Sequence, residues 1–518
     1  MGAVEVDDIV VGAGTAGCVL ARRLVDAGRR VALLDLGAPA TRPDLLTVTG
    51  FPALWGTDAY RTYRTEPQPH AADRRLDWPQ SAVLGGGSAV NGMVYARGHP
   101  ADYDAWAYAG CDGWDWASIR PAFIRCEDHQ DGPSEVHGAG GPLRVSRLRH
   151  PSPVTEAFVE AAVRHGLPFS DDHAREPLGV GYTQLTARDG RRSSTWTAYV
   201  EPVSGDPRLT VVSGARVTRL EFDGDRCVGV RYRRDGVDAA VRAADQVLLC
   251  AGTIGSPHLL LLSGIGPADQ LRSAGVPIRL DLPGVGANLH DHLGCNVVFA
   301  ATRPLPPTES QNLEAQIYWT SRPGLPAPDL QPLFVTQVYP VPGHPVPADG
   351  FTAVGGLLRP YSRGRLVLRS ADPDLAPALD PEIFAEPVDL DCLVAAVELV
   401  RDVAREPALD GWRAAEVAPG DDVRSRTELR DYVRRAVSSY HHQVGTCRMG
   451  VDSAAVVDPA LRVRGVAGLR VVDASVMPSI PSGNTNVPTV AVAERAADLL
   501  LGSAPPAVTW DADRLAVR

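Results

Sequence analysis

Three glycines near the N-terminus have the spacing of a site that binds the diphosphate of a dinucleotide. Gly12, Gly14 and Gly17 form the pattern Gly-x-Gly-x-x-Gly. In this pattern the first glycine permits a tight turn, the second lets the backbone approach the diphosphate, and the third lets the next helix pack closely. Asp35 follows at a suitable separation to accept hydrogen bonds from the adenosine ribose hydroxyls, and its charge would repel a 2′-phosphate.

The flanking residues predict the elements that must hold these glycines. Residues 9–11 are apolar, which is typical of a buried parallel strand. A helix is predicted from Thr15 to about Asp26, and its first amides, at Thr15 and Ala16, would face the phosphates. Residues 31–34 predict a second strand that ends at Asp35. A glycine pattern alone is weak evidence, but strand, glycines, helix, strand and acid in this order favour a real site.

Length and composition limit the function classes. With 518 residues, the chain is long enough for two or three domains. The hydrophobic fraction of 44% and the charged fraction of 22% are those of a globular protein. A net charge of -11 opposes binding to nucleic acid. Every basic residue is arginine, which excludes lysine-dependent chemistry.

The cysteines and the apolar runs suggest where the protein works. The eight cysteines are scattered without CxxC pairs or metal-ligand spacing, so we expect reduced thiols and no metal site. The N-terminus carries acids where a secretory signal would carry positive charge, and no apolar run reaches the roughly 20 residues of a membrane span. We therefore predict a cytoplasmic protein without a membrane span.

Two kinds of sequence pattern alternate along the chain and predict two domains. Strand-glycine-helix patterns occupy residues 1–98, 206–292 and 440–518, which we assign to a dinucleotide-binding domain. Residues 99–205 and 293–439 are rich in Trp, Pro and long loops, and are assigned to a second, substrate-binding domain inserted in pieces. Within this second domain residues 365–368 predict a strand, and residues 393–404 predict an amphipathic helix. The boundary between two domains is a common place for an active site.

Further strings carry a resemblance to a known family. They are LGGGSAVNGMVYARG (residues 84–98), GTIGSPHLLLLSGIG (252–266, with a helix predicted near Ser256 and Pro257 that closes at Gly264), HHQVGTCRMG (441–450), VVDASVMP (471–478) and PSGNTNVPT (481–489). In this order and at these separations, the chain resembles the glucose-methanol-choline (GMC) family of FAD-dependent oxidoreductases from about Asp8 to about Leu501. It is most similar to bacterial choline dehydrogenase-like and hydroxymethylfurfural oxidase-like members. The resemblance implies an α/β fold, with a Rossmann-like FAD-binding domain and a discontinuous α+β substrate domain built on an antiparallel sheet.

The resemblance also implies which residues contact FAD. By position, the diphosphate would lie at Gly12, Gly14 and Gly17, the ribose at Asp35, the isoalloxazine against Gly86, Ser88, Asn91, Gly92 and Met93, and the adenine at Val217, with further contacts from Ala251, Gly252, Asp473, Ala474, Asn486, Pro488 and Thr489. Some family members attach the flavin through a His in the glycine-rich string, but that place is Val90 here. We therefore expect noncovalent FAD.

The catalytic pair of the family falls on His442 and Asn486. Moving a hydride from an alcohol carbon to the flavin N5 requires that the hydroxyl proton also leaves, and a neutral imidazole accepts it near neutral pH. Asn486 can donate a hydrogen bond to the developing alkoxide. His441, just before the base, is predicted to contact substrate, whereas Asn484 is interpreted as a turn residue.

The sequence thus predicts oxidation of a small-molecule CH-OH group, with a primary alcohol as first choice. The negative net charge favours an amino-alcohol or amino-sugar, and the all-arginine composition suggests a sugar or other natural-product intermediate in a high-GC bacterium. The electron acceptor is left open among dioxygen, a quinone and another carrier. Two alternatives also stay open: a family member with non-redox or light-driven chemistry, as a lyase or decarboxylase, and a flavin-binding protein without turnover.

Overall fold

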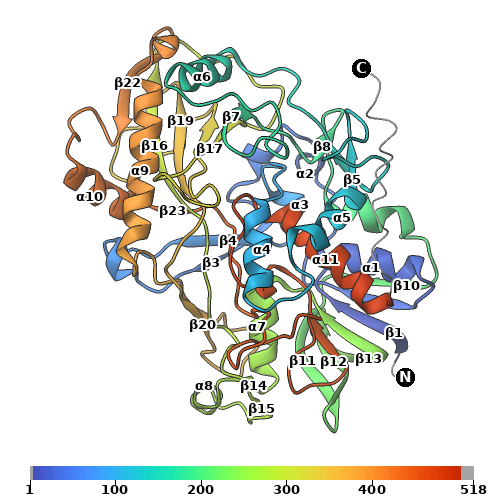
Figure 1. Cartoon of the computed structure of the whole chain (residues 1–518). Helices are drawn as coiled ribbons and strands as arrows, with labels where there is room; N and C mark the ends of the chain where they lie inside the picture. Colours follow the sequence, from blue (N-terminus) through green and yellow to red (C-terminus); the bar gives the residue numbers. More distant parts are fainter. Residues whose placement is uncertain (1–3, 503–518) are drawn as a thin grey trace.

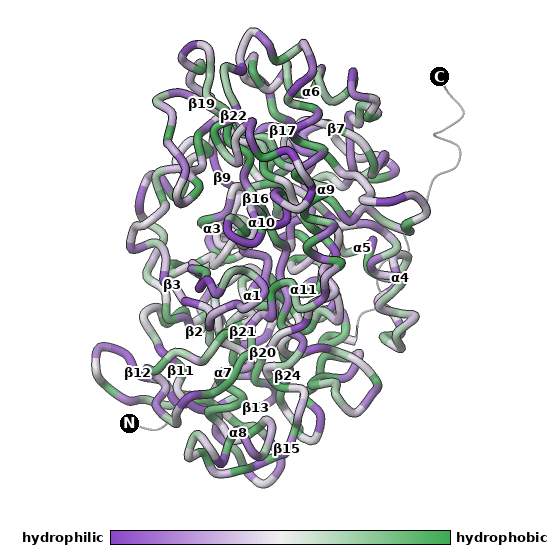
Figure 2. Tube along the Cα trace, turned by 90° about the vertical axis from the view of Figure 1, so that its left-hand side faces the viewer, coloured by the Kyte–Doolittle hydropathy of each residue, from purple (hydrophilic) through white to green (hydrophobic). Residues whose placement is uncertain are grey.

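The computed structural model describes residues 4–502 and contains two sheets that organise the chain. Residues 1–3 and 503–518, the two ends of the predicted dinucleotide-binding domain, lie outside the described residues. Figure 1 places the sheet around β16 (Leu293–Ala301) above the sheet around β1 (Val4–Val11). Figure 2, turned by 90°, keeps the same order from top to bottom, so the two units are stacked along the long axis of the molecule.

The lower sheet is the predicted dinucleotide-binding sheet. Its strand order is β10 (Leu209–Val212), β2 (Val31–Leu34), β1, β13 (Val237–Leu249), β12 (Arg226–Arg234) and β11 (Arg216–Asp223), with β24 (Leu469–Val471) beside the end of β13. β10, β2, β1, β13 and β24 pair in parallel, whereas β11 and β12 extend the sheet antiparallel. The apolar side chains of Ile9 and Val10 are fully buried, as expected for a parallel strand covered on both faces.

The upper sheet is antiparallel, as the resemblance implied. Its order is β22 (Arg413–Ala418), β16, β19 (Gly350–Leu357), β18 (Leu333–Val335), β17 (Leu313–Tyr318) and β7 (Gly179–Tyr182), and β23 (Ser438–Ser439) also pairs with β16. Helix α9 (Pro387–Ala404) packs on β16 and β19, and α6 (Pro153–Arg164) and α10 (Arg426–Ala436) pack beside it. Helix α9 begins six residues before the predicted residue 393, because Pro387 fits the first turn of a helix.

Smaller elements connect the two units. The helices are α2 (Pro43–Leu46), α3 (Gly87–Val90), α4 (Pro100–Tyr108), α5 (Trp116–Cys126) and α8 (Ala268–Ser273), with short turns η1 to η6 at Phe51–Leu54, Pro69–Ala71, Trp196–Val200, Glu201–Val203, Pro407–Leu409 and Ala474–Val476. Two-stranded pairs are formed by β3 (Tyr60–Arg64) with β4 (Asp77–Ser81), β5 (Glu127–His129) with β6 (Leu143–Val145), β8 (Ala187–Arg188) with β9 (Arg191–Arg192), β14 (Ile265–Gly266) with β15 (Leu280–Asp281), and β20 (Arg365–Val367) with β21 (Ala378–Asp380). None of the helices described between residues 4 and 502 is long and apolar enough to cross a bilayer.

Four charged side chains tie the first and last helices together, and we call them the α1–α5–α11 clamp. Helix α1 (Thr15–Asp26) and helix α11 (Asn486–Leu501) lie side by side, and α5 packs on α11. Arg23 of α1 and Arg125 of α5 both pair with Glu494 and Asp498 of α11. The two carboxylates are 2% and 4% exposed, so removing both arginines would leave two buried charges without ion-pair partners.

Helix α7 shows how a C-terminal string supports the lower sheet. The sequence predicted that α7 begins near Ser256, but it spans Gly252–Leu262, so Pro257 lies inside the helix. Proline has no N–H, and the carbonyl of Thr253 therefore lacks its helical donor. The Thr446 hydroxyl donates to that carbonyl at 2.6 Å, and the early start of α7 is possible because this bond compensates for the proline.

Replacement of Thr446 by Val should therefore destabilise the protein. Val has the same shape but no hydroxyl, so the buried Thr253 carbonyl would be left unpaired, at a cost of about 1–3 kcal/mol in the free energy of unfolding. Denaturant unfolding followed by circular dichroism measures the change. Thr302→Val is the matched control, because the Thr302 hydroxyl donates to the Gly411 carbonyl at 2.7 Å at the exposed surface. Equal effects of the two substitutions would contradict the assignment.

Candidate active site

A cavity of about 1180 Å³ runs along the contact between the two units. Its wall takes residues from β1, β2 and α7 of the lower unit and from β17, β18 and β19 of the upper unit. Sites for small molecules usually measure about 300–1,000 Å³. The cavity therefore has room for a dinucleotide and for a second, smaller molecule.

The three glycines at the lower end of the cavity have different surroundings. Gly12 has φ of 107°, and a Cβ there would lie 2.4 Å from the Cys250 carbonyl oxygen. A Cβ on Gly17 would lie 1.7 Å from the carbonyl oxygen of Gly12, so only glycine lets α1 pack on the turn. A Cβ on Gly14 would meet only ordinary contacts, with the Gly86 Cα at 3.8 Å and the Cys250 carbonyl oxygen at 4.0 Å, and Gly14 lines the cavity, which leaves its backbone open to close approach by a ligand.

The Asp35 carboxylate lies at the end of β2, on the cavity wall. It accepts hydrogen bonds from the backbone N–H groups of Ala13 at 2.6 Å and Gly37 at 2.5 Å. Burial raises the pKa of Asp35, while the two N–H groups favour its ionised form. A ribose hydroxyl that donates to this carboxylate would complete its coordination in the predicted way.

A second buried carboxylate, Asp473, holds the start of α7. It accepts hydrogen bonds from the Gly252 N–H at 2.9 Å and the Ser256 hydroxyl at 2.6 Å. A negative charge at a helix N-terminus is favourable, because the first N–H groups are unpaired and the dipole is positive there. Ala251, Gly252, Asp473 and Ala474 thereby form one continuous part of the cavity wall.

Most of the predicted ligand contacts line this cavity. They are Gly12, Gly14, Thr15, Ala16, Asp35, Gly86, Asn91, Gly92, Met93, Val217, Ala251, Gly252, Asp473, Ala474, Asn486 and Thr489, together with His441 and His442. Gly17, Ser88 and Pro488 are not among the lining residues. The Ser88 hydroxyl instead donates to the Gly85 carbonyl at 2.6 Å and contacts the Thr195 hydroxyl at 2.9 Å, so it holds the loop rather than facing a ligand.

The segment Asn288–His292 holds the C-terminal strings in place, and sequence reasoning missed it. The Asn288 amide donates to the carbonyls of Gly445 and Pro478, and His290 Nε2 accepts from the Ile480 N–H at 3.0 Å. Asp291 is 4% exposed and accepts from the backbone N–H of His442 at 2.8 Å, and it also binds the Ser439 hydroxyl and the Gln443 amide. The dense polar string NLHDH before an apolar strand was the available signal.

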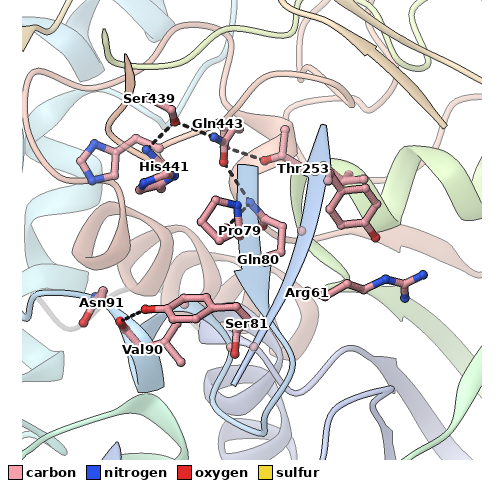
Figure 3. A pocket seen from close by; sticks show the side chains of 18 of the residues that line it. Arg61, Pro79, Gln80, Ser81, Val90, Asn91, Thr253, Ser439, His441 and Gln443 are labelled. Atoms are coloured by element: carbon pink, nitrogen blue, oxygen red, sulfur yellow. Dashed lines mark hydrogen bonds between the residues drawn. The ribbon is translucent and has the colours of Figure 1, made fainter. Parts of the chain in front are cut away.

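Figure 3 shows the hydrogen bonds that hold the loop on both sides of His442. The Ser439 hydroxyl accepts from the His441 N–H at 2.7 Å and contacts the Gln443 amide nitrogen at 3.0 Å. The Gln443 side-chain oxygen accepts from the Gln80 amide at 3.2 Å, and its backbone carbonyl accepts from the Thr253 hydroxyl at 2.7 Å. The position of His442 is therefore fixed from both units of the protein.

The hydrogen bonds of His442 identify which ring nitrogen can act as a base. The Asn484 amide nitrogen lies 3.2 Å from Nε2, and His292 Nδ1 lies 3.0 Å from His442 Nδ1. With the amide donating to Nε2, the ring proton must reside on Nδ1, which donates to His292 Nδ1. Burial, together with neighbouring His292 and His441, holds the pKa of His442 well below its usual value. The ring is therefore neutral at pH 7, Nε2 is unprotonated in this arrangement of hydrogen bonds, and His442 lines the cavity.

The structure gives the two asparagines of the N-x-N string different partners. Asn486, the predicted partner of the base, begins α11, and its side-chain oxygen accepts from the Thr15 hydroxyl at 2.8 Å. Asn484, interpreted from sequence as a turn residue, is the asparagine that contacts His442. Both line the cavity. The sequence did not predict this contact, because nothing in a single sequence shows which way the side chains of a loop point.

His441 lies at the mouth of the cavity beside aromatic side chains. Its ring centroid is 5.4 Å from that of Trp55, which in turn stacks on Tyr60 at 5.3 Å. The backbone of His441 has φ of 64°, a left-handed conformation that non-glycine residues rarely adopt. Phe51, Tyr339 and Tyr440 extend this aromatic wall, so the predicted contact of His441 with substrate stays a prediction that the geometry permits.

A second histidine cluster lies away from the cavity and is an ion-pair network. Glu127, His129 and His137 are close enough together to suggest metal ligands. However, His137 already contacts Glu127 at 2.9 Å and Asp172 at 2.8 Å, and the Arg97 guanidinium pairs with Glu127 at 2.6 Å. The rings of His129 and His137 stack face to face at 3.9 Å, so their in-plane lone pairs do not converge on one point.

Comparison with known proteins agrees with the geometry of this site. Residues 6–294 match the model of the N-terminal region of GMC oxidoreductases, and residues 360–493 match the model of the C-terminal region. The chain is 39% identical to mitochondrial choline dehydrogenase of Mus musculus, over 95% of this chain and 89% of the relative. It is 36% identical to an alcohol dehydrogenase [acceptor] of Pseudomonas putida, over 96% of this chain and 95% of the relative.

A solved structure extends the likeness to the fold. Pyridoxine 4-oxidase from Mesorbium loti superposes with a TM-score of 0.90 at 36% sequence identity, covering 95% of this chain and 98% of that chain. The arrangement of the two units is therefore shared with this solved structure.

Replacement of His292 by Leu tests the assignment of the ring proton. Leu removes the acceptor from His442 Nδ1, so the tautomer with an unprotonated Nε2 loses its support. We expect the variant to keep FAD and to be reduced by an alcohol roughly 10–100-fold more slowly, the usual effect of losing a residue that orients a histidine. Anaerobic stopped-flow absorbance measures the rate. His129→Leu, which removes another buried imidazole outside the cavity wall, should stay within about twofold of the unmodified protein. Reduction of His292→Leu at the unmodified rate would contradict the assignment.

Proposed function

The chain belongs to the GMC oxidoreductase family of FAD-dependent enzymes that act on CH-OH donors, and from this premise we propose that it oxidises an uncharged primary alcohol with His442 as general base. The observation that carries the proposal is the position of His442, which lines a cavity large enough for FAD and a substrate and is held between Asn484 at Nε2 and His292 at Nδ1. Asn486 keeps its predicted part as a donor to the substrate oxygen, since its own oxygen is engaged by Thr15.

The residues present fit the cofactor. The backbone at Gly12 and Gly14 would accept the diphosphate, Asp35 the ribose, Val217 the adenine, and Gly86, Asn91, Gly92, Met93 and Thr489 the flavin ring. FAD, when bound, accepts the hydride from the substrate carbon. We propose that it is held noncovalently, because Val90 stands where some family members carry the linking His and the glycine-rich loop 84–98 contains none.

His442 and its neighbours would manage the proton. The substrate hydroxyl gives its proton to Nε2, and the pair of electrons of the C–H bond leaves with the hydride, so the carbon becomes a carbonyl. The resulting imidazolium donates from Nδ1 to His292, which is neutral because burial lowers the pKa of His292 to about 3. Amide donors near Nε2 stabilise the oxygen while it carries negative charge.

The charge of the cavity wall supports an uncharged substrate. The acids that line the described cavity are Asp35, Asp77 and Asp473, of which Asp35 and Asp473 lie at the dinucleotide end and Asp77 lies on the β3–β4 hairpin. The wall near His441 and His442 is aromatic, and Arg61 and Arg74 also reach the cavity. A cationic group in this place would lack a carboxylate, so we propose a planar, neutral alcohol in place of the amino-alcohol that net charge suggested.

Two further features are proposed from the sequence and chemistry. The compartment is the cytoplasm, which suits eight buried cysteines that are all free thiols. The acceptor that reoxidises the flavin belongs to the expected set of dioxygen, a quinone or another carrier. Reduction of the flavin by an alcohol in the dark also distinguishes this function from the lyase, decarboxylase and non-catalytic alternatives.

Anaerobic reduction of the flavin by matched alcohols tests the proposed function. Benzyl alcohol should bleach the flavin absorbance, and 4-(trimethylammonio)benzyl alcohol, which adds only a charge, should do so at least roughly tenfold less efficiently, as expected for a cation buried without a partner. His442→Ala should keep FAD and slow reduction by about 10²–10⁴-fold, the usual contribution of a general base. The absorbance spectrum of His442→Ala shows whether the variant still contains FAD. Preference for the cationic alcohol, or rapid reduction of His442→Ala, would refute the proposal.

Release of the flavin by acid tests the proposed mode of attachment. Because no His is available at Val90, precipitation with trichloroacetic acid should leave all the yellow colour in the supernatant. Absorbance and mass spectrometry of the pellet measure any flavin that stays attached. A flavin-bearing peptide in the pellet would show a covalent link and contradict the prediction.

A further inference from the structure

Gln331 lies behind Asn484, on the far side from His442, and the proposed function assigns no part to it. The residue is fully buried and precedes β18. Its side-chain nitrogen contacts the Asn484 oxygen at 3.0 Å, the Tyr318 hydroxyl at 2.8 Å and the Gln316 oxygen at 3.1 Å. The three side chains Gln331, Asn484 and His442 thus form a chain of hydrogen bonds that ends at Nε2.

The direction of this chain follows from the orientation of the Gln331 amide. Its nitrogen, which has two hydrogens, lies within hydrogen-bond distance of three oxygens, whereas its side-chain oxygen is buried without a partner among the described residues. An unpaired buried oxygen is unfavourable. In this orientation the Gln331 nitrogen binds the Asn484 oxygen, so the Asn484 nitrogen points toward His442.

The geometry lets the Asn484 nitrogen reach the reacting oxygen. Nε2 and the amide nitrogen are 3.2 Å apart, so an oxygen atom can lie within about 3 Å of both at once. In that position the hydroxyl donates its proton to Nε2, while the amide donates a hydrogen bond to the same oxygen. If the amide were reversed, its oxygen would face Nε2 and would favour the protonated ring.

We propose that Gln331 is a positioning residue, which orients Asn484 as a second donor to the substrate oxygen and keeps Nε2 of His442 free of a proton. The inference rests on the proposed function, because it requires His442 to be the base. Gln331 acts through Asn484 and touches neither the substrate nor the base. No covalent step is added: the hydroxyl proton still moves to Nε2, and the amide only donates a hydrogen bond.

Gln331→Glu reverses the chain at its fixed end and provides the main test. A carboxylate at 331 accepts from the Asn484 nitrogen, which turns the Asn484 oxygen toward Nε2. The titratable groups that face His442 are His292, His441, Asp291 and Tyr440, and all of them stay in place in the variant. We expect the apparent pKa for flavin reduction to rise by at least one unit, and the rate at pH 7 to fall at least tenfold. Stopped-flow reduction by benzyl alcohol, or by another alcohol that reduces the unmodified protein, between pH 5 and 9 measures both.

Gln337→Glu is the matched control for added charge. Gln337 also lines the cavity, but its side chain is bound to Asn312 at 2.6 Å and not to Asn484. Its apparent pKa should rise by less than half as much as that of Gln331→Glu. An equal rise in both variants would overturn the proposal, because charge alone would then explain the effect. An unchanged profile in Gln331→Glu would overturn it as well.

A double substitution keeps the proposal testable if Glu is poorly tolerated at 331. Asn484→Ala removes the donor at a half-buried position, and Gln331→Met removes only its support. If Gln331 acts through Asn484, Gln331→Met slows the reduction of the unmodified protein but has no further effect in the Asn484→Ala background. Independent, multiplying effects would overturn the inference. Normal reduction of His442→Ala would instead refute the proposed function itself, so the two failures are distinguishable.

Discussion

The hydrogen bond between the Nδ1 atoms of His292 and His442 is the constraint on which the chemistry depends. An imidazole has one proton to place when it is neutral, and this bond places it on the side away from the cavity. His292 is fully buried, and desolvation lowers the pKa of both rings, so both are neutral in the resting protein. The bond requires the segment Asn288–His292 to contact the loop that carries His442. Hydrogen bonds from Asn288 and Asp291 hold these two segments together.

The two units contribute different things to the site. The lower sheet and its glycines shape a groove in which a cofactor can lie along the backbone. The upper sheet supplies a largely apolar wall. His292 immediately precedes β16 and is held in place by that strand. Asp473 at α7 and Thr446 against Pro257 connect the C-terminal strings to the lower unit. Neither half could hold the base in its position alone.

Local patterns were sufficient for the elements and for half of the site. Helix α1 and strand β2 occur at the predicted residues, because apolar runs, glycines and a helix-forming stretch leave little choice there. Helices α7 and α9 begin earlier than predicted. In α7 the Thr446 hydroxyl compensates for Pro257 inside the helix, and in α9 Pro387 fits the first turn. His292, Gln331 and the role of Asn484 were missed because they depend on contacts between residues 42 to 153 positions apart. The boundaries of the two predicted domains stay a prediction.

The α1–α5–α11 clamp has a consequence for biosynthesis. The helix that covers α1 and the strand that completes the lower sheet beside β13 are among the last described parts of the chain to leave the ribosome. Until then, the nascent polypeptide carries the glycine turn and its acid without the partners that neutralise Arg23 and Arg125. Asn486 and Thr489 of α11, which line the cavity, therefore join the site only near the end of synthesis of the described chain.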